Sequence, residues 1–329
     1  MQSHRLLKLL VIVILLVVAA LPFAVAQEDE LPDLVMAQRP GFHPEGIEWD
    51  AENERFLAGS LTEGTIFAID DEGEVTPLVE DEDLTSTIGI HIDRETNRLL
   101  VCNSDTTVFS DPEAEGLAQL GIYDLDTGER LHFVDLGELL EEGRHFCNDV
   151  TSDADGNAYV TDTFSPVIYK VTPDGEASVF VEDERLANEM GGLNGIDFHP
   201  DGYLLAAVSG AGALYKIPLD DPEALTQVEL SEPFSVDGMA LQPNGNLIAV
   251  ATTFNEDGTT NSELLEVASD DDWESAEIVN RVPLDAALSP TTVALRDDIP
   301  YVIHAHFNEL FGGGAPVEAF EIMRVDFEE

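Results

Sequence analysis

The chain has 329 residues and a formal net charge of −53, because 67 Asp and Glu side chains outnumber 14 Lys and Arg. This charge excludes binding to nucleic acid, which needs clustered cations against its phosphates, and attraction to an anionic membrane surface. The chain is nevertheless not a disordered acidic polymer, since 44% of its residues are hydrophobic. Salt screens repulsion between like charges, so we expect a saline habitat.

The first 26 residues are predicted to be a secretory signal peptide. Arg5 and Lys8 precede an apolar run over residues 9–26, which ends in the small-x-small cleavage pattern Ala24-Val25-Ala26. An uncleaved membrane anchor is the alternative, because the run is almost long enough to span a bilayer, but the cleavage pattern favours removal. We therefore expect a secreted or extracytoplasmic domain over residues 27–329, with no stable membrane association after cleavage.

One strand pattern then recurs six times along the chain. Each copy is followed by a turn rich in Gly, Asn and Asp and by a second apolar strand. The copies begin 43, 60, 46, 43 and 54 residues apart, and a period of about 40–50 residues is typical of a β-propeller. The copies are Glu45-Gly46-Ile47-Glu48-Trp49-Asp50, Ile88-Gly89-Ile90-His91-Ile92-Asp93, Asn148-Asp149-Val150-Thr151-Ser152-Asp153, Asn194-Gly195-Ile196-Asp197-Phe198-His199, Asp237-Gly238-Met239-Ala240-Leu241-Gln242 and Thr291-Thr292-Val293-Ala294-Leu295-Arg296.

The last copy lacks one strand. After residues 301–307 only residues 319–327 have strand character, whereas Leu34-Val35-Met36 near the mature N-terminus has no assigned partner. We expect this N-terminal segment to supply the outer strand of the sixth blade, so that the ring has no open edge. The sequence thus predicts an all-β fold, a single six-bladed β-propeller. Two β-sandwich domains are the alternative, which explains neither the six copies nor the lack of a linker rich in Pro or Ser.

The first residue of each copy is predicted to face the central channel. The inner strands of a propeller surround its channel, so these positions converge at one end of it. Asp and Asn are also common in turns, and only their shared position in the repeat points to a site. Carboxylate and amide oxygens suit Ca²⁺ better than Zn²⁺ and leave coordination positions for water and substrate. The four positions that carry such oxygens are Glu45, Asn148, Asn194 and Asp237.

With these four residues in this order, the sequence resembles the SMP-30/gluconolactonase/LRE-like family, which is related to the paraoxonases and to diisopropylfluorophosphatase. The resemblance covers about residues 31–327 and implies a six-bladed propeller with a catalytic divalent cation, usually calcium, in its channel. The local contexts that carry it are Pro44-Glu45-Gly46, Asn148-Asp149-Val150, Asn194-Gly195-Ile196 and Asp237-Gly238-Met239.

The resemblance implies a hydrolase that acts on a small molecule, a lactone or related ester. We expect a secreted monomer in which Ca²⁺ polarises the carbonyl group and Asp237 assists the attack of water. A chain with so few cations offers little to bind a phosphorylated or sugar-acid substrate. Two alternatives stay open: a non-catalytic propeller that binds a ligand or partner around a structural calcium, and a lyase on the same fold.

Three histidines and two cysteines complete the candidates. His43, His304 and His306 fall near the predicted channel mouth, although alternation along a strand lets at most one of the last two face the channel. A purely structural role is the alternative for each. Cys102 ends a second strand and Cys147 precedes a predicted ligand in the next blade, so we expect a disulfide between them in an exported chain. Two buried free thiols are the alternative.

Overall fold

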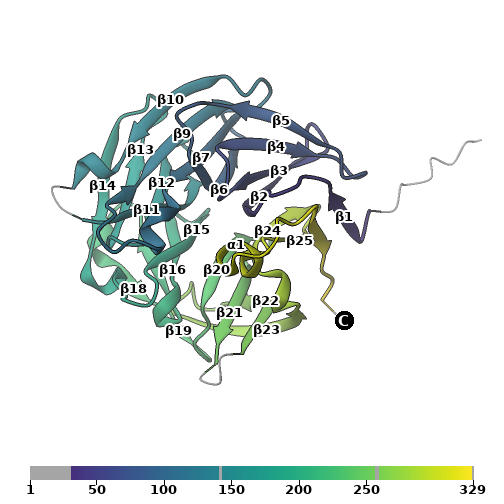
Figure 1. The fold of residues 1–329 in the computed structure, drawn as a ribbon. Coiled ribbons are helices and arrows are strands. Elements are labelled where there is room, and N and C mark those ends of the chain that lie inside the picture. The colour runs from purple at the N-terminus through teal and green to yellow at the C-terminus, as the bar shows by residue number, and fades with distance from the viewer. Residues whose placement is uncertain (1–30, 141–142, 256–258, 328–329) are drawn as a thin grey trace, which may run out of the picture. The chain divides into compact units, whose positions relative to one another are not determined.

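The recurring pattern forms the innermost strand of each of six antiparallel sheets, which surround one axis (Figure 1). The computed structural model describes residues 31–140, 143–255 and 259–327, and the predicted signal peptide lies outside these ranges. The inner strands are β2 (Pro44–Asp50), β6 (Ser86–Asp93), β11 (His145–Ser152), β15 (Leu193–His199), β20 (Val236–Leu241) and β24 (Pro290–Arg296).

The second strand of each blade is buried on both faces. In the first blade, Phe56 and Ala58 pack toward the sixth blade, whereas Leu57 packs toward the second. Successive side chains of a strand point to opposite faces, which explains the nearly continuous apolar runs at these positions. The second strands are β3 (Arg55–Ser60), β7 (Arg98–Ser104), β12 (Ala158–Asp162), β16 (Tyr203–Val208), β21 (Leu247–Phe254) and β25 (Ile299–His304).

The third and fourth strands complete each blade toward the outside of the ring. The third strands are β4 (Thr65–Ile69), β9 (Gln119–Asp124), β13 (Val167–Val171), β17 (Ala213–Pro218), β22 (Thr260–Ala268) and β26 (Phe320–Arg324). The fourth are β5 (Val75–Glu80), β10 (Arg130–Asp135), β14 (Ala177–Glu182), β18 (Thr226–Gln227), β23 (Ser275–Leu284) and β1 (Leu34–Ala37). Two short strands add parallel pairs, β8 (Gly116–Leu117) with β11 and β19 (Glu229–Leu230) with β23.

The N-terminal strand closes the ring, as the sequence predicts. β1 pairs antiparallel with β26, and the last blade has the order β1-β26-β25-β24. The described apolar residues form six clusters, each filled chiefly from two neighbouring blades. One of them joins Val35 and Phe42 to Tyr301 and Phe320 across the junction of the sixth and first blades. The prediction of a closed six-bladed propeller is therefore confirmed.

The connections contain short helices. One α-helix, α1 (Phe307–Gly312), interrupts the path from β25 to β26 and was not predicted. Among the described residues, no helix has the length and apolarity that crossing a membrane requires. The 3-10 helices are η1 (Thr106–Phe109), η2 (Gly137–Leu139), η3 (Glu184–Leu186), η4 (Ser209–Ala211), η5 (Pro222–Ala224) and η6 (Ala286–Leu288).

Candidate functional site

Every inner strand carries a bulge at the point where the repeated motif begins. In β2 the register with β3 shifts between Pro44 and Ile47, so Glu45 and Gly46 lie opposite one residue, Gly59. The same shift of two residues against one occurs in the other five inner strands. A bulge re-aims the side chain that it carries. The first residue of every motif is thereby placed in the same local geometry at one end of the channel.

Close packing between inner strands explains why glycine follows the first residue in four of the six motifs. A Cβ atom on Gly46 would lie 2.4 Å from the carbonyl oxygen of Ile88, and one on Gly195 would lie 2.6 Å from that of Asp237. Real Cβ atoms do not approach backbone so closely. The beginnings of adjacent inner strands are therefore in direct contact, which fixes the side chains that they carry.

Two of the four predicted ligands are hydrogen-bonded to each other, and a third lies within electrostatic range. Asn194 Nδ2 donates a hydrogen bond to Asp237 Oδ1 at 3.0 Å. Asp237 also acts electrostatically on Glu45, whose backbone carbonyl accepts a hydrogen bond from Thr291 Oγ1 at 2.9 Å. Thr291 occupies the first position of the sixth motif, so its hydroxyl ties the sixth blade to the first. The structure thus brings Glu45, Asn194 and Asp237 together across three blades.

The fourth predicted ligand, Asn148, is oriented by Thr163. Asn148 Nδ2 donates to Thr163 Oγ1 at 2.8 Å, and that hydroxyl donates to the carbonyl oxygen of Leu193 at 2.8 Å. An amide has one acceptor oxygen beside its donor nitrogen. Because the nitrogens of Asn148 and Asn194 are engaged, their Oδ1 atoms are the ones that could bind a cation.

The carboxylate of Glu45 is buried, that of Asp237 is half-buried, and the two repel one another. Burial raises the pKa of Glu45 well above its usual value, and the charges of Asp237 and Asp149 raise it further. Burial also raises the pKa of Asp237 to about 6, although the hydrogen bond from Asn194 opposes this. Two such carboxylates with two amide oxygens fit a hard divalent cation, whose charge would remove the repulsion. Within the described ranges no cluster of three or more His, Cys, Asp or Glu side chains forms a metal site, so a cation here requires the amides.

A known protein family matches a region of the chain that contains all four predicted ligands. Residues 43–263 match the SMP-30/Gluconolactonase/LRE-like region, which is more than half of the chain. The chain belongs to this family. Membership supports a lactonase-type hydrolase in general and a divalent cation in general. A search of curated proteins finds no match to the chain.

Solved structures share the fold of this SMP-30/gluconolactonase family member at low sequence identity. The Malassezia sympodialis allergen Mala s 1 has 18% identity and a TM-score of 0.73, with 90% of this chain and 97% of that chain covered. XC5397 of Xanthomonas campestris, described as a gluconolactonase, has 14% identity and a TM-score of 0.58, with 89% of each chain covered. Regucalcin of Agrobacterium tumefaciens, described as calcium-binding, has 16% identity and a TM-score of 0.58, covering 90% and 95%.

A second set of polar side chains, all half-buried, follows along the same inner strands, and sequence reasoning missed it. Asp197 Oδ2 accepts the backbone N–H of Leu241 at 2.7 Å. Asp149 Oδ2 accepts that of Ile196 at 3.2 Å. Each carboxylate therefore links its own inner strand to that of the next blade. Burial raises the pKa of Asp149 to about 7, against the two backbone hydrogen bonds that favour its ionised form.

His91 is the basic side chain of this second set. Its Nδ1 lies 3.0 Å from Glu48 Oε1, and its Nε2 lies 3.1 Å from Ser152 Oγ. Burial lowers the pKa of His91, but the hydrogen bond with Glu48 and the charges of Glu48, Asp197 and Asp149 together raise it overall. A signal was available: Glu48, His91 and Asp197 each stand three residues after the first residue of their motif.

The three histidines predicted near the mouth are buried and hydrogen-bonded. His43 Nδ1 donates to the carbonyl oxygen of Ala305 at 2.8 Å, which joins the first and sixth blades. His306 Nε2 lies 2.7 Å from Glu321 Oε2, and His304 Nδ1 lies 3.4 Å from the Glu321 carbonyl oxygen. Among the described residues, none of the three bonds to a predicted ligand. Their contacts support the structural alternative for this family member.

Cys102 and Cys147 are free thiols in the structure, buried between the second and third blades. Burial raises the pKa of Cys102 well above its usual value, and a hydrogen bond with the Cys147 thiol adds to the rise. The backbone is also tied here, because Ser104 Oγ donates to the Cys147 carbonyl oxygen at 3.0 Å. The thiols lie side by side as expected, but the disulfide is not formed, and it stays a prediction for the exported protein.

Alkylation and mass spectrometry will test this bridge. In secreted protein that is denatured without reductant, we expect neither cysteine to be alkylated, because an oxidising compartment couples thiols that fold into contact. After reduction both should be labelled. Protein refolded in reductant provides the control, since both cysteines should then react on denaturation. Labelling of both cysteines in unreduced secreted protein would show that the dithiol persists.

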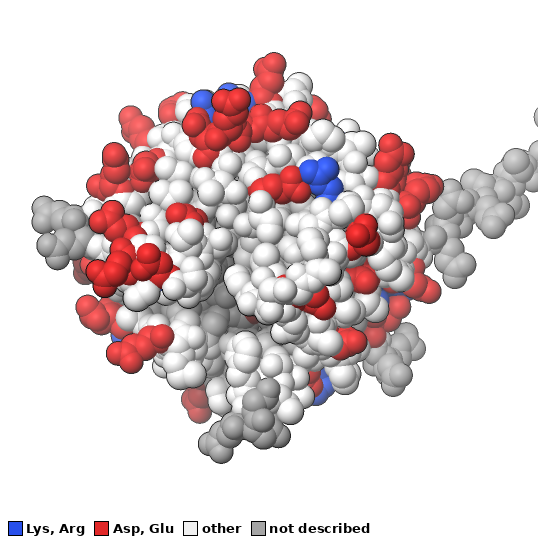
Figure 2. Space-filling view, in the orientation of Figure 1, with Lys and Arg blue, Asp and Glu red and all other residues white. Residues whose placement is uncertain are grey.

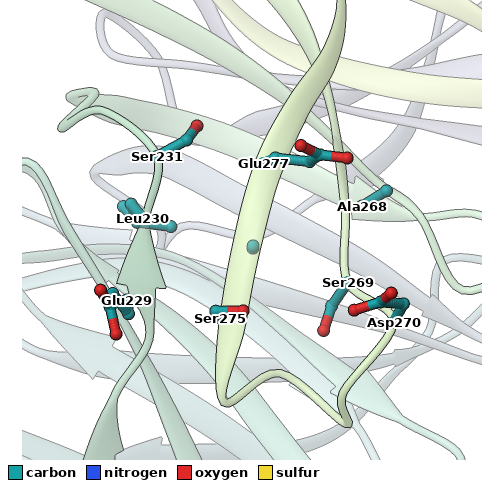
Figure 3. A pocket seen from close by; sticks show the side chains of 9 residues that line it. Glu229, Leu230, Ser231, Ala268, Ser269, Asp270, Ser275 and Glu277 are labelled. Atoms are coloured by element: carbon teal, nitrogen blue, oxygen red, sulfur yellow. The ribbon is translucent and has the colours of Figure 1, made fainter.

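An open pocket of about 560 Å³ lies elsewhere in this propeller (Figure 3). Its lining includes Ser275 and Glu277 of β23, Glu229 of β19, and Ser269 and Asp270 of the turn after β22. That turn is at the end of the fifth blade opposite to the start of β20. None of the four predicted ligands lines this pocket, so it is separate from the candidate site.

Proposed function

We propose that the protein is a secreted, calcium-dependent hydrolase that opens a lactone or cleaves a related ester at the channel end. One observation carries the proposal. Equivalent bulges in four blades of a gluconolactonase-family propeller present two oriented amides and two carboxylates, of which one is buried and one half-buried. A donor set of oxygen atoms alone favours Ca²⁺ over Zn²⁺, and the calcium-binding description of regucalcin supports the same choice.

The four side chains would differ in their roles in metal binding and proton transfer. A bound divalent cation would supply Lewis-acid polarisation of the substrate carbonyl. Glu45 and Asp237 would hold the cation and balance its charge, while Asn148 and Asn194 would add neutral oxygens. Asp237 Oδ1 accepts from Asn194, so Oδ2 is the atom that we assign to take a proton from the attacking water. The hydroxyl group adds to the carbonyl carbon, the ring C–O bond breaks, and the proton passes to the leaving alkoxide, which yields a hydroxy acid.

A non-catalytic propeller is the second candidate. Mala s 1, a solved structure with the same fold, is described as an allergen and not as an enzyme. In that case the cation would stabilise the channel while its open end binds a ligand or a partner.

A substrate screen separates these candidates. Purified protein is assayed against lactones, aryl esters and phosphotriesters, first with a chelator and then with Ca²⁺ restored. We expect lactone turnover that the chelator abolishes and Ca²⁺ restores, with a product heavier by one water. A turnover rate that the chelator does not change would contradict the proposed role of the cation. Stoichiometric calcium without turnover of any substrate would favour the binding propeller, and a product without added water would indicate a lyase.

A further inference from the structure

The channel end that carries the site is rimmed by exposed apolar side chains. Inner strands begin at this end and second strands return to it, so the connections that follow second strands surround the channel mouth. Phe109 and Phe311 lie in such connections and are 51% and 60% exposed, and Phe254, the last residue of the second strand β21, is 79% exposed. Met190, at 88%, lies in the connection that leads into β15. Single exposed apolar residues are ordinary, but several at one end of so acidic a chain indicate a binding surface.

Charged side chains lie mainly around this apolar surface and not on it. Figure 2, in the orientation of Figure 1, shows Asp and Glu gathered at the periphery and a mostly uncharged surface around a central hollow. The acidic shell repels anions, whereas the middle of this face offers little to attract a charged group.

Three phenylalanines in edge-to-face or tilted contact lie close in the chain to the predicted ligand Asn148 or to the residue that orients it. The ring of Phe109 is 4.8 Å from that of Phe146 and 5.5 Å from that of Phe164, measured between centroids. Phe146 precedes Asn148 by two residues, and Phe164 follows Thr163, the residue that orients the Asn148 amide. The aromatic group is therefore assembled from β11, which also carries Asn148, from the turn after β12, and from η1.

Helix α1 completes the apolar side of the mouth. Phe307 and Leu310 pack against the same apolar cluster as Phe164. That cluster includes Ile88, which stands at the motif position where four other blades carry the oxygen ligands. Figure 1 shows α1 over the middle of the ring. An apolar sector thus adjoins the oxygen ligands, and we call Phe109, Phe164, Phe307 and Leu310 the apolar rim.

A cation in this sector is already engaged. The Arg144 guanidinium lies 4.5 Å from the centroid of the Phe164 ring, and its Nε donates to the Ala114 carbonyl oxygen at 3.2 Å. Because this guanidinium stacks on a ring and donates to backbone carbonyls, it is less available to a carboxylate or phosphate of a ligand.

We infer that the substrate is an uncharged lactone or ester with an alkyl chain or aromatic group, which rests on the apolar rim while its carbonyl lies at the four oxygen ligands. This inference rests on the proposed function and names its substrate class. Burial of each methylene group is expected to raise kcat/KM by about two- to fourfold until the chain extends past the rim.

A series of lactones with increasing alkyl side chains tests the inference on the calcium-loaded protein. We expect kcat/KM to rise with chain length, and a polyhydroxylated sugar lactone to be a poorer substrate than an alkyl lactone of similar size. Equal or better turnover of the sugar lactone would overturn the inference while leaving the hydrolase function intact.

Single substitutions locate the effect. Phe109→Ala and Phe311→Ala remove exposed rings at or next to the rim, so the fold should tolerate both, and the loss of kcat/KM should grow with chain length to about tenfold for the longest chain. Leu131→Ala is the matched control, because Leu131 is exposed on the outer strand β10, and it should leave the whole series unchanged. Equal losses at every chain length would contradict the rim.

Binding distinguishes failure of the rim from failure of the proposed function. Alkyl lactams are not opened, so calorimetry can follow their affinity even if no lactone is hydrolysed. Affinity that rises with chain length in the wild type, and less steeply in Phe109→Ala, supports the rim. Affinity that does not depend on chain length would overturn the inference. A second experiment measures sedimentation with neutral phosphatidylcholine vesicles. Sedimentation that is lost in Phe109→Ala, together with hydrolysis that does not depend on chain length, would also overturn it.

Discussion

Replacing Asp237 by Asn is expected to lower kcat/KM for lactone hydrolysis by about 10²- to 10⁴-fold, because an amide neither balances a divalent cation nor accepts a proton from water. The isosteric change keeps the side-chain volume and a hydrogen bond with Asn194 within reach. Steady-state kinetics at saturating Ca²⁺, with circular dichroism to verify the fold, will measure the loss. Asp201→Asn is the matched control, since the Asp201 side chain is 73% exposed in a turn away from the site.

The free energy of unfolding of the Asp237→Asn variant gives a second test, whose result would differ if Asp237 had only a structural role. Burial raises the pKa of Asp237 to about 6, so its ionised form costs the metal-free protein free energy. At pH 8 without metal, Asp237→Asn should therefore unfold with a free energy about 1–3 kcal/mol higher than the wild type. With saturating Ca²⁺ the wild type should instead have the higher free energy of unfolding. Retention of most of the activity, or destabilisation in both conditions, would contradict the assigned role.

Removal of the cation is expected to change the direction in which stability depends on pH. Burial raises the pKa of Asp237 to about 6 and that of Asp149 to about 7, and it also raises that of Glu45. In the unfolded chain such groups titrate near pH 4. Between pH 4 and pH 7 the folded state therefore binds more protons, and metal-free stability falls as pH rises through this range.

Calcium should oppose this trend, because its ligands must be ionised and its affinity rises with pH. We expect the gain in Tm from Ca²⁺ to be large at pH 8 and small at pH 5, measured by calorimetry in chelator and in excess Ca²⁺ at constant high salt. The Asp237→Asn variant provides the control for the overall acidic charge, because only the difference between the two proteins reports the site. A calcium gain that is equal at all pH values would exclude these carboxylates as ligands.

The fold was predictable from the sequence because its determinants are local and repeated. Strands such as Leu99-Leu100-Val101 are apolar on both faces, and the turn residues between strands recur with the period of the blade. The closing strand was predicted by comparing the strands found with the four expected in each blade, because the last blade lacked one strand and the N-terminal segment contained one without a partner. Helix α1, of six residues, is too short to show helical periodicity, so no pattern could reveal it.

The site was predictable only in part. The shared motif position identified four candidate ligands, and the structure shows how bulges and neighbouring glycines place them. Asp197 shares the fourth motif position with Glu48 and His91, and that signal was overlooked. Asp149 gave no signal, because acidic residues are common throughout this chain. What distinguishes both aspartates is a backbone N–H supplied by the next blade. The apolar rim is likewise assembled from distant segments. Such contacts between blades are set by closure of the ring and not by local sequence.

The pairing of β1 with β26 also constrains the order of folding events. Nearly the whole chain separates these two strands, so the contact carries a large loop-closure entropy and belongs to the slowest class of β pairing. During synthesis the first strand to emerge must wait, unpaired, until the last one is made. Five blades can complete themselves from neighbouring segments as the chain lengthens, whereas the sixth forms only after β26 has been made. The ring of blades therefore stays open until the last of its strands is available.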